Sequence, residues 1–149
     1  MKIYAGSDHA GFNLKQRLIE AARGWGHEVE DLGPATPDRV DYPDFGAKVG
    51  RAVAADSGSR GLLVCGSGIG IAMAADKVPG VRASVLWSEE SAKLSRQHND
   101  ANVFSVGERL IEGDLAEAML KVWLETEFEG GRHADRVAKL DAISEQAPA

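Results

Sequence analysis

Strand-like segments alternate with helix-like segments along almost the whole chain, and this alternation constrains the fold more than any other feature. Segments with the character of strands occupy 2–5, 28–32, 61–65, 81–86 and 102–106. Predicted helices cover 12–25, 44–56, 88–98, 114–128 and 132–143, with apolar residues at helical spacing in 12–25, 44–56 and 114–128, and a further helix opens within 66–70 and runs to about 77. Connections of this kind join parallel strands through helical crossovers. The sequence therefore predicts an α/β protein, a parallel sheet with helices on both faces.

Length and charge narrow the class of protein. The 149 residues are expected to form one domain, 1–149. The 17 basic and 23 acidic side chains give a net charge of −6, which disfavours nucleic-acid binding because phosphate affinity depends on clustered lysine and arginine. No apolar run approaches the roughly 20 residues of a membrane span, and 1–6 resembles a strand rather than a signal peptide. We therefore expect a cytoplasmic protein with neither membrane nor nucleic-acid partners.

Three glycines, Gly66, Gly68 and Gly70, follow the third predicted strand and open a helix. Backbone N–H groups in such a loop can approach a phosphate or an oxyanion closely. The spacing does not fit the dinucleotide-binding fingerprint, whose third glycine would fall at Ile71, and this disfavours a dinucleotide-dependent oxidoreductase. Taken alone, the glycines favour a tight strand-to-helix turn without a ligand.

Cys65, the last residue of that strand, changes this interpretation. It is the only cysteine of the chain, so an intrachain disulfide is excluded. A lone cysteine is usually a small buried hydrophobic residue. Next to the amides of a helix N-terminus, however, the thiolate is favoured and can act as nucleophile or general base. Both a catalytic and a structural role stay open for Cys65.

Other polar clusters suit proton transfer and anion binding. The pairs within Asp8-His9 and His98-Asn99-Asp100 can exchange protons near neutral pH, or serve as hydrogen-bonded loop fixtures. Arg132 and Arg136 share one face of the last helix beside His133, as a phosphate clamp or a solvated basic face. No H-E-x-x-H or cysteine-rich pattern is present, so neither a metal nor a redox cofactor is expected. The inventory fits a small phosphorylated substrate that bears a carbonyl group.

Five motifs in order resemble those of the type B ribose-5-phosphate isomerases: 7–12 (SDHAGF), 41–43 (DYP), 65–70 (CGSGIG), 95–102 (SRQHNDAN) and 130–133 (GGRH). The wider family includes isomerases of galactose 6-phosphate and allose 6-phosphate and enzymes that act on tetrulose phosphates. The resemblance implies a three-layer α/β/α sandwich around a five-stranded, Rossmann-like sheet. It also implies a homodimer or homotetramer with shared active sites, and metal-independent aldose–ketose isomerisation through a cis-enediolate. Ribose 5-phosphate, converted to ribulose 5-phosphate, is the leading substrate.

The resemblance also implies a role for each matching residue. Cys65 would move a proton between C1 and C2, Ser67 would move protons on the substrate oxygens, and His98 with Asp8 would open the furanose ring. Backbone N–H groups of the glycine loop would stabilise the enediolate. The residues implied in substrate binding are His9, Tyr42, Gly66, Gly68, Gly70, Asn99, Arg109, Arg132 and Arg136. The two glycines at 130–131 would let the last helix, about 132–146, swing out and dock on a partner subunit.

Three positions depart from the family pattern. Ile71 replaces the glutamate base of some members, so the chain resembles the cysteine subgroup. In that subgroup threonine is commoner than Ser67, and serine keeps the hydroxyl. Trp87 stands where many ribose enzymes have a smaller or polar residue and would reshape the sugar pocket. A tetrose phosphate, allose 6-phosphate or galactose 6-phosphate therefore stays open as substrate, with a non-catalytic sugar-phosphate or nucleotide binding module as a distant alternative.

Overall fold

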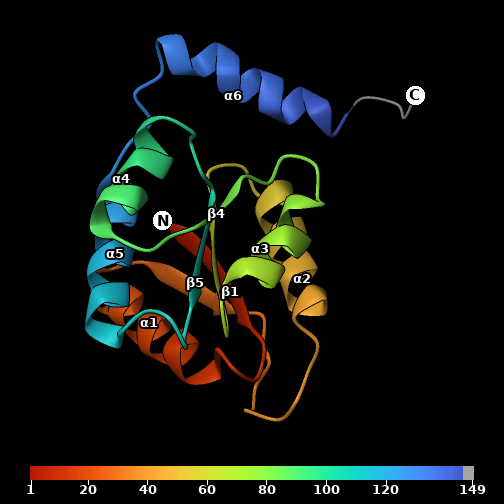
Figure 1. Ribbon diagram of the computed structural model, residues 1–149, viewed down its shortest axis with the longest axis vertical. Coiled ribbons are helices and arrows are strands. Elements are labelled where there is room, and N and C mark those ends of the chain that lie inside the picture. Colours follow the sequence, from red (N-terminus) through yellow and green to blue (C-terminus); the bar gives the residue numbers. More distant parts are fainter. Residues whose placement is uncertain (146–149) are drawn as a thin grey trace.

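Strands and helices alternate in the folded chain, as the sequence pattern predicts (Figure 1). The computed structural model describes residues 1–145, so residue 146 of the expected last helix lies outside the described residues. The strands are β1 (Lys2–Ser7), β2 (Glu28–Asp31), β3 (Arg60–Cys65), β4 (Ala83–Val85) and β5 (Val103–Gly107). The helices are α1 (Phe12–Gly24), α2 (Tyr42–Ala55), α3 (Ile69–Asp76), α4 (Glu89–Gln97), α5 (Gly113–Glu125) and α6 (Arg132–Ile143).

The five strands form one parallel sheet in the order β2-β1-β3-β5-β4. β3 lies at its centre, with Cys65 beside Gly107 of β5 and Val64 beside Ser7 of β1. Because all strands run in one direction, the residues that follow them gather at one edge of the sheet. The predicted five-stranded parallel sheet is confirmed, and its carboxyl edge receives the ends of β1, β3 and β5.

Two hydrophobic cores hold the helices against the sheet and make the predicted three-layer α/β/α sandwich. On one face, α1, α4 and α5 pack on strand residues such as Leu62 and Phe104. On the other face, α2 and α3 pack on Leu63 and Cys65. The alternation of side chains along β3 sends successive residues to opposite cores. Cys65 thereby lies on the α2–α3 face, at the point where the chain turns into α3.

The fifth helix is shorter than its apolar pattern predicts. The pattern extends to residue 128, whereas α5 ends at Glu125 and Thr126 is extended. The Arg96 side chain donates to the Thr126 carbonyl oxygen at 3.1 Å, and the Glu129 N–H donates to the Gln97 carbonyl oxygen at 3.1 Å. These tertiary hydrogen bonds replace the last helical turn and fasten residues 126–129 to the end of α4.

Helix α6 lies across the opposite, amino edge of the sheet, at the top of Figure 1. Of its side chains, His133 and Val137 are buried, and Leu140 and Ile143 are exposed. Arg82 reaches it by donating to both carboxylate oxygens of Asp141, at 3.0 and 3.1 Å. Among residues 1–145, no helix combines the length and apolar character needed to cross a membrane.

Candidate active site

A cavity of about 550 Å³ lies at the carboxyl edge of the sheet. It gathers predicted site residues from four separate stretches of the sequence. Its lining consists of Asp8, His9, Ala10, Tyr42, Cys65, Gly66, Ser67, Ile69, Gly70, Met73, Arg109 and Leu110. One strand-end cavity thus collects the thiol, the glycine loop, a carboxylate, an imidazole and a guanidinium.

The thiol of Cys65 is only 4% exposed and is aimed at the glycine loop. The Gly68 backbone N–H donates a hydrogen bond to Sγ at 3.1 Å. Gly68 has φ +78°, a left-handed conformation that a side chain would strain, and a Cβ atom there would lie 2.6 Å from the Val106 carbonyl carbon. The turn therefore requires glycine, and it holds the Gly68 N–H group against the Cys65 sulfur.

The end of β5 holds this loop in place through hydrogen bonds. The buried Ser105 hydroxyl donates to the Gly68 carbonyl oxygen at 2.7 Å, and the Arg109 N–H donates to the Gly66 carbonyl oxygen at 3.1 Å. Ser67 Oγ accepts from the Ile69 N–H at 3.2 Å, which leaves its proton available to another acceptor. The sequence reasoning missed Ser105, although a serine inside an otherwise apolar strand was the available signal.

At positions 66 and 70 neighbouring side chains leave no room for anything larger than glycine. A Cβ atom at position 70 would lie 2.5 Å from the Tyr42 ring, and one at position 66 would lie 3.0 Å from Arg109 Nη1. Tyr42 is the first residue of α2, and Arg109 follows β5. These two glycines bring a phenol and a guanidinium close to the loop that carries the N–H groups.

Asp8 and His9 close the cavity on the β1 side. Asp8 is buried, and its carboxylate accepts from the Gly11 N–H at 3.0 Å. His9 Nδ1 lies 3.1 Å from the Val40 carbonyl oxygen and 3.3 Å from the Val40 nitrogen. The Asp8 side chain is therefore held by the turn that follows β1, and the His9 side chain by the loop that contains Val40.

The remaining predicted residues, His98, Asn99, Arg132 and Arg136, lie at the opposite edge of the sheet. His98 follows α4 and precedes β5, whose first residue, Val103, pairs with Gly61 at the start of β3. Cys65 lies at the other end of β3, beside Gly107 at the end of β5. Among the described residues of one chain, the cavity that contains Cys65 has none of these four in its lining.

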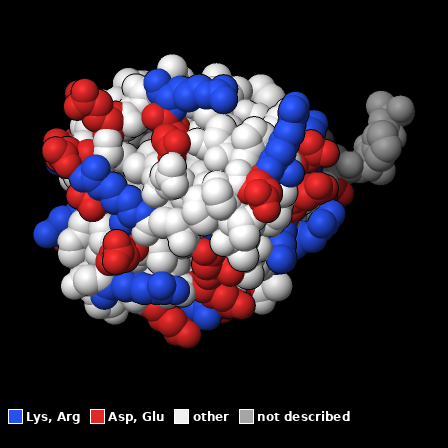
Figure 2. Space-filling model, turned by 90° about the horizontal axis from the view of Figure 1, so that it is seen from below, with Lys and Arg blue, Asp and Glu red and all other residues white. Residues whose placement is uncertain are grey.

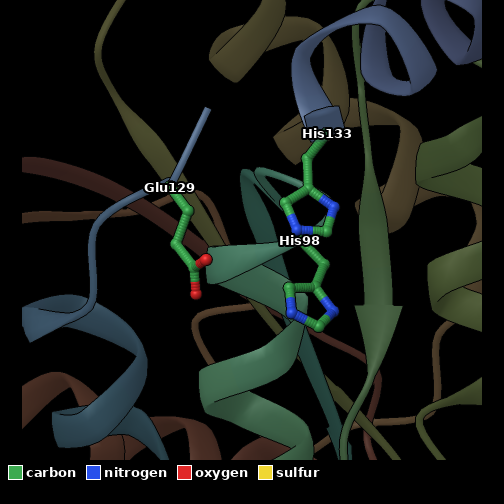
Figure 3. Close-up of side chains that lie close together, drawn as sticks. All are labelled: His98, Glu129 and His133. Carbon is green, nitrogen blue, oxygen red and sulfur yellow. The ribbon is translucent and has the colours of Figure 1, made fainter. Parts of the chain in front are cut away.

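At that amino edge, His98 and His133 stack face to face (Figure 3). Their ring centroids are 4.3 Å apart and the rings are inclined by 14°. Burial lowers the pKa of His133, and the neighbouring His98 and Arg132 lower that pKa further. Arg132 and Arg136 stand one turn apart on the exposed side of α6, where a phosphate can reach both.

Trp87 lies apart from the Cys65 cavity in the described chain. Its side chain is 68% exposed and lines a different cavity, of about 340 Å³, together with Asn99. Trp87 therefore lies with Asn99, one of the predicted residues outside the Cys65 cavity, and not with the residues that line that cavity. Trp87 can form a wall of the sugar pocket only if Asn99, which lines the same cavity, also lies beside the substrate.

The face of the molecule seen from below carries charges of both signs (Figure 2). Acidic and basic side chains alternate around a central area that is largely uncharged. On this face, neither sign forms a continuous tract among the residues that the structure describes. A small anion held by individual arginines suits such a surface better than an extended polyanion does.

Comparisons of the sequence and of the structure with known proteins identify the same family. The ribose/galactose isomerase family matches residues 3–140. Ribose-5-phosphate isomerase B of Escherichia coli is 43% identical over 145 residues, which cover 97% of this chain and 97% of that protein. A solved ribose-5-phosphate isomerase B from Clostridium thermocellum is 48% identical with a TM-score of 0.95, covering 97% of this chain and 98% of that one.

A second solved structure was determined with a ligand. It is ribose-5-phosphate isomerase B from Mycoplasma genitalium with bound ribulose 5-phosphate. It is 38% identical to this chain, with a TM-score of 0.95 and coverage of 98% of this chain and 97% of that chain. The similarity therefore extends over nearly the whole length in both sequence and fold.

Proposed function

The chain belongs to the ribose/galactose isomerase family, and on this premise we propose that it interconverts ribose 5-phosphate and ribulose 5-phosphate. Family membership makes it an enzyme, an aldose–ketose isomerase of phosphorylated sugars. The choice of ribose 5-phosphate is supported by the relatives from Escherichia coli and Clostridium thermocellum, which carry that activity in their names.

The observation that carries the proposal is the Cys65 sulfur, 3.1 Å from the Gly68 nitrogen, in the wall of the strand-end cavity. The Cys65 thiolate takes the proton from C2 of the open-chain aldose and returns it to C1. Charge that develops on the substrate oxygens in the enediolate is stabilised by N–H groups of the 66–70 loop. The proton of the C2 hydroxyl moves to the C1 oxygen through Ser67, so no proton or electron is gained or lost overall.

Ring opening must precede this step, and in our proposal it needs groups from both edges of the sheet. Asp8 lines the Cys65 cavity, while His98 lies beyond the start of β5. A second copy of the chain that brings its own His98 and Asn99 over the cavity completes the site. The active unit is thus at least a homodimer with shared sites.

Exposed apolar side chains at the rim of the cavity support this assembly. Ile69, Met73 and Leu110 line the cavity and are 47%, 62% and 67% exposed. Exposed apolar side chains around one cavity are typical of a surface that another protein covers. Helix α6, held to its own chain by few side chains, is the element that we expect to dock on the partner.

The phosphate is then bound from two sides. His9 and Arg109 lie in the cavity of one copy, and Arg132 and Arg136 arrive on α6 of the other. Arginine pairs suit a phosphate monoester because each guanidinium can donate two hydrogen bonds in a fixed geometry. This arrangement makes phosphate binding depend on the assembly.

A different sugar phosphate is the second candidate, and Trp87 is the observation that favours it. Trp87 lines the same cavity as Asn99, so a second copy that supplies Asn99 also brings the indole near the sugar. A large side chain there would favour a substrate of another length or stereochemistry. Tetrose, allose and galactose phosphates form the panel for comparison.

The test is turnover of ribose 5-phosphate by the purified protein in EDTA, at several substrate concentrations. We expect efficient conversion to ribulose 5-phosphate, and a Cys65→Ala variant provides the control for contaminating isomerase. Turnover of a tetrose or hexose phosphate with little activity on ribose 5-phosphate would overturn the substrate assignment. Equal turnover by wild type and Cys65→Ala would overturn the role of the thiolate.

A further inference from the structure

Three side chains that can each ligate a metal ion converge at the amino edge of the sheet (Figure 3). His98 follows α4, Glu129 belongs to the segment before α6, and His133 lies in the first turn of α6. One ligand atom from each residue lies within 4.8 Å of the other two. His133 is buried, His98 is half-buried and Glu129 is exposed, so the cluster opens to solvent on one side.

The backbone on both sides of this cluster is fixed. The Glu129 N–H donates to the Gln97 carbonyl oxygen at 3.1 Å, which sets residue 129 beside the end of α4. The His133 N–H donates to the Gly130 carbonyl oxygen at 3.0 Å and closes the turn between them. Gly130 and Gly131 have φ of +66° and +54°, which glycine adopts easily. The fold therefore brings the backbone of these three residues together.

Two imidazoles and one carboxylate are a ligand set typical of zinc sites with an open fourth position. Mg²⁺ and Ca²⁺ prefer oxygen ligands, so this set selects a transition metal ion. Tetrahedral zinc needs ligand atoms about 3.4 Å apart, given bonds of roughly 2.1 Å. Because the stacked His98 and His133 rings cannot both direct a nitrogen lone pair at one ion, metal binding requires the half-buried His98 to turn out of the stack and the exposed Glu129 to rotate toward it.

Charges around the cluster act in both directions. Arg132 and Arg136 repel a cation, whereas Glu129 attracts one. We therefore expect a site weaker than a structural zinc centre and easily stripped by a chelator.

We propose that His98, Glu129 and His133 bind Zn²⁺ or a similar divalent transition metal ion, and that the bound ion inhibits the isomerase. Inhibition follows because a metal bonded to His98 takes the lone pair with which that imidazole would exchange a proton during ring opening. This second half rests on the proposed function, whereas metal binding itself does not.

Metal binding is tested in a Cys65→Ser background, which contains no thiol that could compete for the ion. Calorimetry with Zn²⁺ should give one ion per chain, no response to Mg²⁺, and a dissociation constant at least about tenfold weaker in Glu129→Gln, since even outer-shell partners contribute 10–100-fold. Co²⁺ should give the visible absorption of a tetrahedral complex without thiolate bands. Glu127 is an exposed glutamate of the same segment, so Glu127→Gln is the matched control and should leave the affinity for Zn²⁺ unchanged.

Equal affinities of the Glu129→Gln and Glu127→Gln proteins, or no binding at all, would overturn the site. The activity arm uses the protein with Cys65 intact and ribose 5-phosphate as substrate. Zn²⁺ should inhibit it, EDTA should restore turnover, and Glu129→Gln should raise the inhibitory concentration by the same factor as the dissociation constant. Binding without inhibition would overturn the inhibitory role, and inhibition that is unchanged in Glu129→Gln would assign the effect to Cys65 instead.

Discussion

The Cys65 sulfur accepts a hydrogen bond from the backbone N–H of Gly68 at 3.1 Å, so the only thiol of the chain is tied to the turn that opens α3. The same turn is fixed from behind by the Ser105 hydroxyl, 2.7 Å from the Gly68 carbonyl oxygen. The proposed proton acceptor and the N–H groups proposed to stabilise the enediolate are therefore held by one backbone conformation.

Replacing Gly68 with alanine should cost both stability and activity. A non-glycine residue at φ +78° is strained by about 1–2 kcal/mol, and its Cβ atom would also lie 2.6 Å from the Val106 carbonyl carbon. Gly58→Ala is the matched control, because φ there is +87° and nothing lies within 4 Å of an added Cβ. Chemical denaturation should show a clearly larger loss for Gly68→Ala, and equal losses would contradict the close packing of the turn.

Replacing Cys65 with serine should abolish catalysis while preserving the fold. The hydroxyl fills nearly the same space but is a far weaker proton acceptor, so kcat should fall by about 10²–10⁴-fold. Exchange of the C2 proton of ribose 5-phosphate with deuterated solvent should disappear with it. If Cys65→Ser retained that exchange, another group would be the base.

Mixing two inactive variants should restore activity if each site uses two copies of the chain. Cys65→Ala and His98→Ala subunits, unfolded and refolded together, should yield heterodimers in which one site has both wild-type residues. Random pairing in a twofold-symmetric dimer then restores about a quarter of the wild-type activity. No recovery from a well-folded mixture would mean that both residues act within one chain.

Removing Arg132 or Arg136 should weaken binding of the substrate more than its conversion. Each guanidinium would contact the phosphate in the ground state and the transition state alike, so KM should rise by about tenfold or more with kcat little changed. Lys139→Ala removes a positive charge from an exposed position of the same helix and serves as the control. A fall in kcat at constant KM would argue against the phosphate clamp.

The sequence predicted the helix and sheet layers and the set of site residues at the carboxyl edge of the sheet, because both follow from the local pattern of strands and helices. Alternating apolar runs identify strands and helices, and the direction of parallel strands brings Asp8, Cys65 and Arg109 to one edge. The end of α5 was predicted too late, because its apolar pattern continues past Glu125, and hydrogen bonds from distant residues such as Arg96 replace the last turn.

His98 follows a predicted helix and precedes a predicted strand, so in a parallel sheet it lies at the amino edge, away from Cys65. Arg132 follows the last strand, and no later strand fixes which edge it occupies. The family resemblance anticipated a site shared between subunits, and the separation within one chain supplies a physical reason for that expectation. Ser105 was missed because its role depends on a carbonyl group 37 residues away.

Acidic pH should loosen the contact between α6 and the end of α4. The pKa of His133 is lowered in the folded protein, by burial and then by His98 and Arg132, so the unfolded chain binds a proton there more readily. The stabilising contribution of neutral His133 is therefore complete above the unfolded pKa of 6.5 and is lost as pH falls below it. Hydrogen exchange of α6 amides, corrected for the intrinsic rate, should accelerate between pH 7.5 and about pH 5.5 relative to β3 amides. A His133→Gln variant cannot gain this proton and should show a flatter pH dependence, whereas an unchanged profile would assign the transition to another group such as His27, whose pKa burial also lowers.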